Sequence, residues 1–280
     1  MYVGVSTIVT LFLSNTRLAR EFYDHGGESI VFNIYRQVER DNAMEPVLRL
    51  LQICTLVYKE GVWVNHKVPD DVVKKLFRHS KRALELRLNT QLMPSLNLLC
   101  VYSRINIQHM VEILESLDGL DHMLRCIKSH ATSSWIIRYT VLCISMMVNT
   151  KESLMNRLFD LNGEVVVVNA VMTSYTVYQP AAHQPIVSLF ERICVSPRFV
   201  LPMDRIFRYM YMSLDKLVGR AVLINTILNT TSAFINHSPD MKMKARRYGS
   251  VEWLMKMKEF PSCTSSMKLM ADNLCKQILI

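Results

Sequence analysis

The residue types that most often carry catalysis are scattered along this chain and form no recognisable motif. The sequence has eight histidines, and no two of them stand at the i, i+4 spacing that places two metal ligands on one helical face. A phosphate-binding glycine loop, a G-x-G-x-x-G turn, a G-x-S-x-G nucleophile turn and an H-E-x-x-H zinc motif are all missing from the sequence. We therefore predict a protein that is not an enzyme and that uses neither a metal nor a cofactor.

The cysteines suggest packing and not chemistry. There are seven of them, an odd number, and none belongs to a C-x-x-C pair, which argues against a disulfide framework and against structural zinc. Apolar neighbours raise the pKa of a thiol, so reactive thiols are the less favoured reading. Lys276 beside Cys275 and Arg192 near Cys194 are the exceptions. This usage favours a reducing compartment, the cytoplasm or the nucleus.

The amino-acid composition indicates that helices position any binding residues. The 280 residues are 50% apolar and 20% charged, with only 8 Gly and 9 Pro, which disfavours disorder, a collagen-like fibre and a loop-rich β-sandwich. The apolar run Val3 to Leu13 is shorter than the roughly 20 residues that span a bilayer. We expect an all-α fold and no membrane partner.

A fixed period organises the chain. A helical stretch, a Gly and an apolar helical stretch recur around Gly27, Gly119, Gly163 and Gly249, at spacings of 92, 44 and 86. Pro69 and Pro202 stand near the middle of the two long gaps, and Gly or Pro is what a sharp bend between helices needs, Gly because it permits positive φ. The period is therefore about 43 residues.

A second marker follows the same period. A small residue recurs in the most apolar stretches, at intervals of 46, 43, 51, 39 and 42, and a small side chain lets neighbouring helices approach closely. These positions are Cys54, Cys100, Cys143, Cys194, Ala233 and Cys275.

This pattern resembles the armadillo repeat. LFLSNTRLAREFYDHGGESIVFNIY, from Leu11 to Tyr35, is most similar to the family pattern, in which a third helix leads through a short helix to Gly-Gly. The resemblance implies a right-handed superhelical solenoid of about six degenerate three-helix repeats in a single domain, residues 1–280; HEAT-type helical pairs are the alternative. The expected units are a partial repeat at 1–15 and repeats at roughly 16–60, 61–105, 106–150, 151–197, 198–238 and 239–280.

The resemblance also implies a concave groove lined by the third helices. Met44 to Glu60 and Ser134 to Val148 have the pattern of such helices, each with one polar stripe on an otherwise apolar surface. The residues that we expect to line the groove are Arg49, Gln52, Ser95, Arg138, Ser145, Arg192, Asn225, Asn229 and Asn273.

Basic residues recur on the second helices. Residues 1–60 carry 6 Lys and Arg against 7 Asp and Glu, and the remaining 220 carry 27 against 17, so the net charge of +9 arises downstream. Stacked repeats would align these residues into a basic ridge on the convex side, either an ordinary solvated face or a contact for an anionic partner. The expected ridge residues are Arg36, Lys75, Arg78, Arg125, Lys128 and Arg208. A second cluster precedes Gly249 and consists of Lys242, Lys244, Arg246 and Arg247. We interpret it as the exposed basic side of an amphipathic first helix, with a short localisation or nucleic-acid patch as the alternative.

The ligand expected in the groove is an extended or helical segment of another protein, with acidic character. Armadillo proteins that grip basic peptides use a Trp with an Asn four residues later, but here Tyr139 follows Trp135, Lys67 follows Trp63 and Met257 follows Trp253. The alternative is a solenoid that binds nucleic acid on its basic ridge. The apolar ends of the array would also suit continuation into, or burial against, another domain.

Overall fold

The computed structural model describes residues 2–39, 41–57, 68–173, 180–196, 198, 221–237 and 239–280. Within these ranges the regular elements are helices and no strand occurs, so the prediction of an all-α fold is confirmed. The chain forms two compact units, Met1–His130 and Ala131–Ile280, and each is described by itself.

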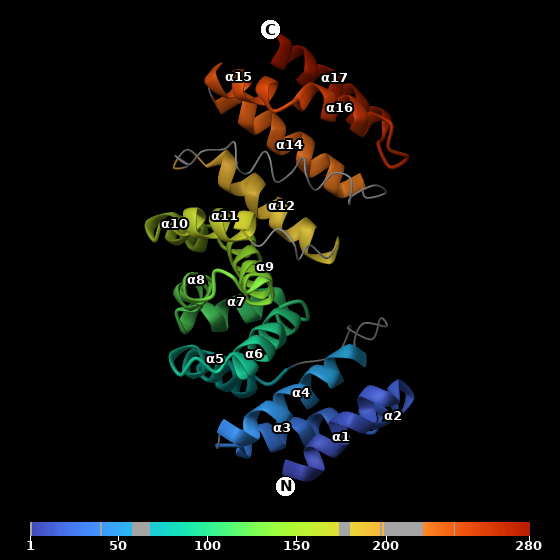
Figure 1. Ribbon diagram of the computed structural model, residues 1–280, viewed down its shortest axis with the longest axis vertical. Coiled ribbons are helices and arrows are strands. Elements are labelled where there is room, and N and C mark those ends of the chain that lie inside the picture. Colours follow the sequence, from blue (N-terminus) through green and yellow to red (C-terminus); the bar gives the residue numbers. More distant parts are fainter. Residues whose placement is uncertain are drawn as a thin grey trace. The chain divides into compact units, whose positions relative to one another are not determined.

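The first unit contains eight helices in its described residues, drawn in blue to green in Figure 1. They are α1 (Tyr2–Ser14), α2 (Thr16–Asp24), α3 (Gly27–Gln37), α4 (Asp41–Val57), α5 (Asp70–Glu85), α6 (Asn89–Tyr102), α7 (Ile107–Ser116) and α8 (Gly119–Ser129). Among the longer helices, α4 packs against both α1 and α6.

The second unit also contains eight described helices, coloured from green to red (Figure 1). They are α9 (Ser134–Thr150), α10 (Glu152–Asp160), α11 (Gly163–Thr173), α12 (Pro180–Val195), α14 (Ala221–His237), α15 (Pro239–Arg247), α16 (Ser250–Lys258) and α17 (Ser265–Leu279). The long helices pack in sequence order, α9 against α12, α12 against α14 and α14 against α17.

Helix length follows a recurring order along the chain. Two short helices of 9 to 11 residues precede a long one of 15 to 17 residues in α2–α3–α4, α7–α8–α9, α10–α11–α12 and α15–α16–α17. The predicted bends at Gly27, Gly119, Gly163 and Gly249 all lie at the junction between the first and second helix of these groups. The bend expected at Pro202 lies outside the described residues.

The reason for glycine at these bends differs from the predicted one. Positive φ belongs to the residue before the glycine at three junctions, namely Gly26, Asp118 and Asn162, and to Gly249 itself at the fourth. A Cβ atom on Gly119 would lie 2.8 Å from the carbonyl oxygen of Leu114. Close approach of the two helices, and not a left-handed backbone, therefore excludes a side chain at this position.

The predicted third helices are present with shifted ends. Ser134 to Val148 corresponds to α9, which continues to Thr150. α4 begins at Asp41, three residues before the predicted start, and Pro46 lies inside the helix. Residues 58–60 of the predicted helix lie outside the described residues.

The repeating small residues are packing residues. All five cysteines of the series are buried, whereas Ala233 is half-buried. Burial raises the pKa values of Cys54 and Cys194 to about 12. These thiols are therefore neutral and shielded, as the sequence predicted.

Side-chain hydrogen bonds between helices join residues roughly one repeat apart. In the first unit, bonds pair His109 with Asp70, Ser80 with His122 and His130 with Asn89, at separations of 39, 42 and 41 positions. In the second unit, Arg192 donates to the carbonyl of Val148 and Arg198 to that of Asn156, at separations of 44 and 42. Within each unit, these bonds join helices that are about one repeat apart in the sequence.

Candidate binding surface

The long helices of each unit leave a narrow stripe of side chains in contact with solvent. On α4 this stripe contains Glu45, Arg49 and Gln52, at the i, i+4, i+7 spacing of one helical face. Arg49 donates two hydrogen bonds to the Glu45 carboxylate, of 2.8 and 3.2 Å. Arg49 and Gln52 therefore lie on the predicted face, but the charge of Arg49 is balanced within the helix.

Ser95, the groove residue predicted on α6, is buried with 0% of its surface exposed. Its hydroxyl donates to the carbonyl of Gln91 at 2.7 Å, which satisfies the polar group inside the unit. The exposed stripe of α6 instead contains Met93 and, half-buried, Asn97 and Val101. The prediction that Ser95 lines the groove is therefore wrong. A serine whose hydroxyl bonds to a carbonyl group of its own helix can occupy a core position, and the sequence alone does not show that it is buried.

The most distinctive exposed surface in the second unit is an aromatic and arginine cluster at the start of α9. Trp135 is 41% exposed, and its ring stacks on Tyr139 with centroids 6.2 Å apart. The guanidinium carbon of Arg138 lies 5.4 Å from the Trp135 ring centroid and 5.7 Å from that of Tyr139. Arg138 is thus held in place by two rings, and Trp, Tyr and Arg are the types enriched where proteins bind tightly.

Ser145, predicted to share the Arg138 stripe, is also buried, with 0% exposure. It lies seven residues after Arg138, only about 20° away around the helix, so helical spacing alone did not reveal its burial. Met146 and Asn149 occupy the exposed side instead. Asn149 donates to the Ser145 hydroxyl at 3.2 Å, so Ser145 supports a surface residue and does not itself face a partner.

Arg192 on α12 is half-buried and engaged within the unit. One guanidinium nitrogen donates to the carbonyl of Val148 at 2.5 Å, and the other forms an ion pair with Glu152. The predicted role as an orientation donor for a ligand needs correction, because this side chain already fixes α12 against the end of α9.

The amides of α14 lie along one partly exposed face of the helix. Asn225 is exposed and Asn229 half-buried, and Ser232 and Asn236 continue the stripe along the same face. Asn229 forms a hydrogen bond with Glu191 of α12, whose pKa is raised by burial. Asn273 on α17 is exposed as well.

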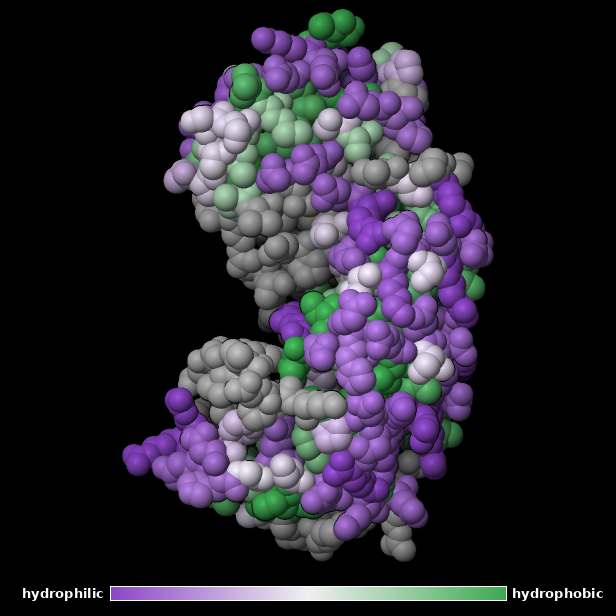
Figure 2. Space-filling view, turned by 180° about the vertical axis from the view of Figure 1, so that it is seen from behind, coloured by the Kyte–Doolittle hydropathy of each residue, from purple (hydrophilic) through white to green (hydrophobic). Residues whose placement is uncertain are grey.

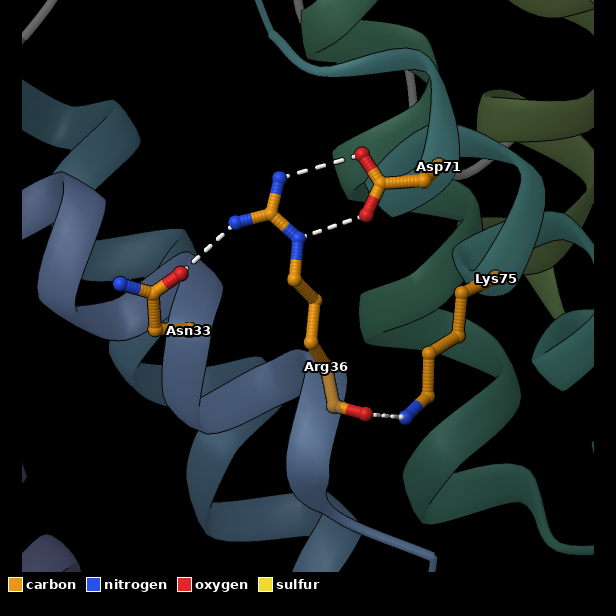
Figure 3. Close-up of polar contacts among 4 residues, drawn as sticks. All are labelled: Asn33, Arg36, Asp71 and Lys75. Carbon is orange, nitrogen blue, oxygen red and sulfur yellow. Dashed lines mark hydrogen bonds and ion pairs between the residues drawn. The ribbon is translucent and has the colours of Figure 1, made fainter.

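Two of the residues predicted for the basic ridge, Arg36 and Lys75, make contacts between helices. Arg36 at the end of α3 donates to both carboxylate oxygens of Asp71 on α5, at 2.6 and 3.1 Å, and to Asn33 (Figure 3). Lys75 points back to the end of α3 and donates to the carbonyls of Arg36 and Val38 at 2.7 and 2.8 Å. Both contacts join α3 to α5. Lys75 does so by satisfying carbonyl groups at the C-terminus of α3, where a cation is favourable.

The remaining ridge residues differ from this pair. Arg78 on α5 and Arg125 and Lys128 on α8 are exposed, and the first unit is mainly hydrophilic over α5 and α8 in Figure 2. Arg208 lies outside the described residues.

The sequence reasoning missed Asn97, Asn149 and Asn236. All three are asparagines on the solvent side of long helices. Asparagine is a poor helix former in a helix interior, so its recurrence in otherwise apolar long helices was the signal that could have identified these positions.

No group of three or more His, Cys, Asp or Glu side chains that could hold a metal ion occurs in the described parts of the chain. His122 is buried beside Cys126, with Sγ 3.7 Å from Nε2. Burial lowers the pKa of His122 to about 3 and raises that of Cys126 to about 12. A neutral thiol beside a neutral imidazole in the core is not an activated nucleophile.

No protein-family model matches the chain, and no curated protein matches it significantly. Within the described residues, no helix combines the length and the apolar character needed to cross a membrane.

Proposed function

We propose that the chain is a non-enzymatic scaffold that binds a segment of another protein on the solvent-facing stripes of its long helices. In this proposal it is an armadillo-like, right-handed superhelical solenoid of about six degenerate three-helix repeats. The segment is extended or helical and has acidic character, and the compartment is the cytoplasm or the nucleus.

The recurring order of helix lengths supports the repeat part of the proposal. The sequential packing of the long helices, α1–α4–α6 in one unit and α9–α12–α14–α17 in the other, is what stacked repeats produce. The hydrogen bonds that link residues 39 to 44 positions apart support the same arrangement, since each repeat contacts its neighbours.

The single observation that carries the binding part is the cluster of Trp135, Arg138 and Tyr139. An exposed Trp stacked on a Tyr offers a large apolar area with few rotatable bonds, and such residues lose little entropy on binding. The guanidinium group of Arg138 lies beside the exposed Trp135 ring, so a segment that packs on this ring would bring an acidic side chain close to Arg138. The amides of Asn225 and Asn229 would bond the backbone of an extended segment.

Affinity purification with the intact chain, followed by identification of the bound proteins, provides the ligand for the test. A peptide from the recovered partner is then titrated against the wild type, Trp135→Ala and Arg138→Glu. We expect each substitution to weaken binding by roughly 10-fold or more, the size typical of central interface residues.

The matched controls are Trp253→Ala and Arg125→Glu, which make the same chemical changes elsewhere. Unchanged affinity in the two α9 variants, together with a normal circular dichroism spectrum, would contradict the proposed surface. Equal losses in the controls would do the same.

The exposure of Arg78, Arg125 and Lys128 favours a second candidate, nucleic-acid binding on a basic ridge. Phosphate contacts would make such binding fall steeply with salt. Charge reversal of these three residues should abolish it, while Arg138→Glu should leave it unchanged.

A further inference from the structure

A cluster of cations and exposed apolar side chains covers α15 and α16 in the second unit. Between Pro239 and Lys258 the sequence has six Lys and Arg against two Asp and Glu. On α15, Arg246 and Arg247 are exposed and Lys242 is half-buried. In the turn that follows, Tyr248 is 40% exposed.

Local ion pairs account for part of this charge. Lys244 pairs with Asp240 at 2.9 Å, and Lys258 with Asp272 at 2.5 Å. No ion pair joins Lys242, Arg246 or Arg247 to an acidic side chain of the described residues, so these three cations face solvent with their charge unbalanced.

Aromatic rings lie among these cations. Tyr248 directly follows Arg247 in the sequence, and the ammonium group of Lys256 lies 4.9 Å from the centroid of the Trp253 ring. The two aromatic residues are separated by the Gly249 turn, where φ is 70° and the chain reverses between α15 and α16. The rings and the cations thus share one short helical hairpin, whose helices contact each other.

We propose that this surface, made of Lys242, Arg246, Arg247, Tyr248, Trp253 and Lys256, binds single-stranded nucleic acid. Cations that track a phosphate backbone, combined with rings on which bases stack, are the chemistry by which proteins hold single strands without reading sequence. Basic residues on a helix surface alone would fit any polyanion. The exposed Tyr beside a pair of arginines adds a feature that an unstacked base uses and a bare polyanion does not.

An anionic membrane is the less suitable occupant. Met243 and Met255 are exposed at 57% and 48% and could enter a bilayer. However, Glu252 and Glu259 are exposed on the same face of the helix as Met255, three and four residues away. Inserting that methionine would bring both carboxylates against anionic headgroups, which is unfavourable.

The proposal is independent of the protein-binding surface on α9 and of the ridge on α5 and α8. The probe is a fluorescein-labelled 20-nucleotide oligo(dT), titrated with the intact chain at several salt concentrations and followed by fluorescence anisotropy. With four cations contacting phosphates, the slope of log K against log salt is expected to be about −3 for a single strand.

Two variants test the two halves of the surface. Arg246→Gln combined with Arg247→Gln should weaken binding at least about 10-fold at low salt and reduce the slope to about −1.4, since two phosphate contacts are lost. Tyr248→Ala should weaken binding roughly 5- to 100-fold and leave the slope unchanged, because stacking involves no counterion release.

The matched control is Arg78→Gln combined with Arg125→Gln, which removes the same number of charges from α5 and α8. We expect this control to bind oligo(dT) like the wild type, and circular dichroism to show that all variants are folded. Equal loss in the control, no effect of Tyr248→Ala, or binding to phosphatidylserine vesicles without binding to oligo(dT) would each overturn the proposal.

Discussion

His122 is a buried histidine whose surroundings favour the neutral imidazole. Its Nε2 atom lies 2.8 Å from the hydroxyl of Ser80, which donates its own proton to the carbonyl of Phe77 at 2.8 Å. His122 is therefore the donor to Ser80, through Nε2–H. The pKa of His122 is lowered to about 3, mainly by burial and also by the positive charges of Lys81 and Arg125.

This lowered pKa predicts a loss of stability in acid. The unfolded chain binds a proton below pH 6.5 that the folded chain accepts only near pH 3, so the contribution is complete above pH 6.5 and is lost as the pH falls. At pH 5 we expect the free energy of unfolding to be about 2 kcal/mol lower than it is above pH 6.5. Urea unfolding between pH 4 and 7.5 measures this loss. In His122→Gln, this part of the slope of unfolding free energy against pH should be absent. An unchanged slope in that variant would contradict the assignment.

Glu28 affects the pH dependence of stability in the opposite direction. Only 8% of this residue is exposed in the first turn of α3, and burial raises the pKa of its carboxyl group to about 7. The folded chain retains the proton up to about pH 7, whereas the unfolded chain loses it near 4.5. Stability from this group is therefore greatest in acid and decreases as the pH rises from 4.5 to 7.

We expect Glu28→Gln to stabilise the first unit at pH 8 by about 1 to 3 kcal/mol, because the buried carboxylate no longer has to ionise. At pH 4.5 the gain should disappear. Denaturant unfolding at the two pH values measures the difference. The control Glu21→Gln, an exposed carboxyl group on α2, should show no such gain, and an equal effect in both variants would argue against burial as the cause.

Lys75 and Arg78 on α5 look equivalent in the sequence, but only Lys75 contacts the preceding helix. Lys75 satisfies two carbonyl groups at the end of α3, while Arg78, one turn later on α5, is exposed. We expect Lys75→Met to destabilise the first unit by about 1 to 2 kcal/mol, since two carbonyl groups, one of them part-buried, lose their donor. Arg78→Met should cost less than about 0.5 kcal/mol. Thermal unfolding of both variants distinguishes this arrangement from a uniform solvated ridge, which predicts equal effects.

The bends between helices respond to substitution in opposite directions. Gly119→Ala would place a methyl group against the Leu114 carbonyl, so we expect a loss of about 1 to 3 kcal/mol. Arg87 has φ of 57° after α5, where Leu88 and Arg87 donate to Ala83 and Leu84, the hydrogen bonds of a helix end that favours glycine. Arg87→Gly should be neutral or stabilise by up to about 1 kcal/mol. Chemical denaturation measures both, and a stabilising Gly119→Ala would contradict the close approach.

Elements were predictable from the sequence where a local signal existed. The Gly bends and the long apolar stretches placed helix junctions and α9 correctly, because chain reversal and helix packing restrict residue type locally. Individual surface residues were less predictable. Ser95 and Ser145 differ from exposed serines by hydrogen bonds to their own helices, and the contacts of Arg36 and Lys75 span 35 to 39 positions. Pairings at that range leave no local trace in sequence.

Across the whole molecule, the proposed binding surfaces for protein and for nucleic acid lie on different helices. The first unit uses two of its cations to join α3 to α5. The second unit presents an aromatic and arginine cluster on α9 and a separate cationic hairpin at α15 and α16. Because these surfaces lie on different helices, substitutions in one should leave binding at the other unchanged, and the two binding assays together test that independence.

Site-resolved photocrosslinking tests the central proposal most directly. A photoreactive residue is placed at Met146 on α9, at Asn225 on α14 and, as a control, at Ser153 on α10, and the partner recovered with the wild-type chain is added. Crosslinks from the two long-helix positions to one segment of that partner, with none from Ser153, are the result that the proposal predicts. Crosslinking from Ser153 with silence at Met146 and Asn225 would show that the partner binds elsewhere and would contradict it.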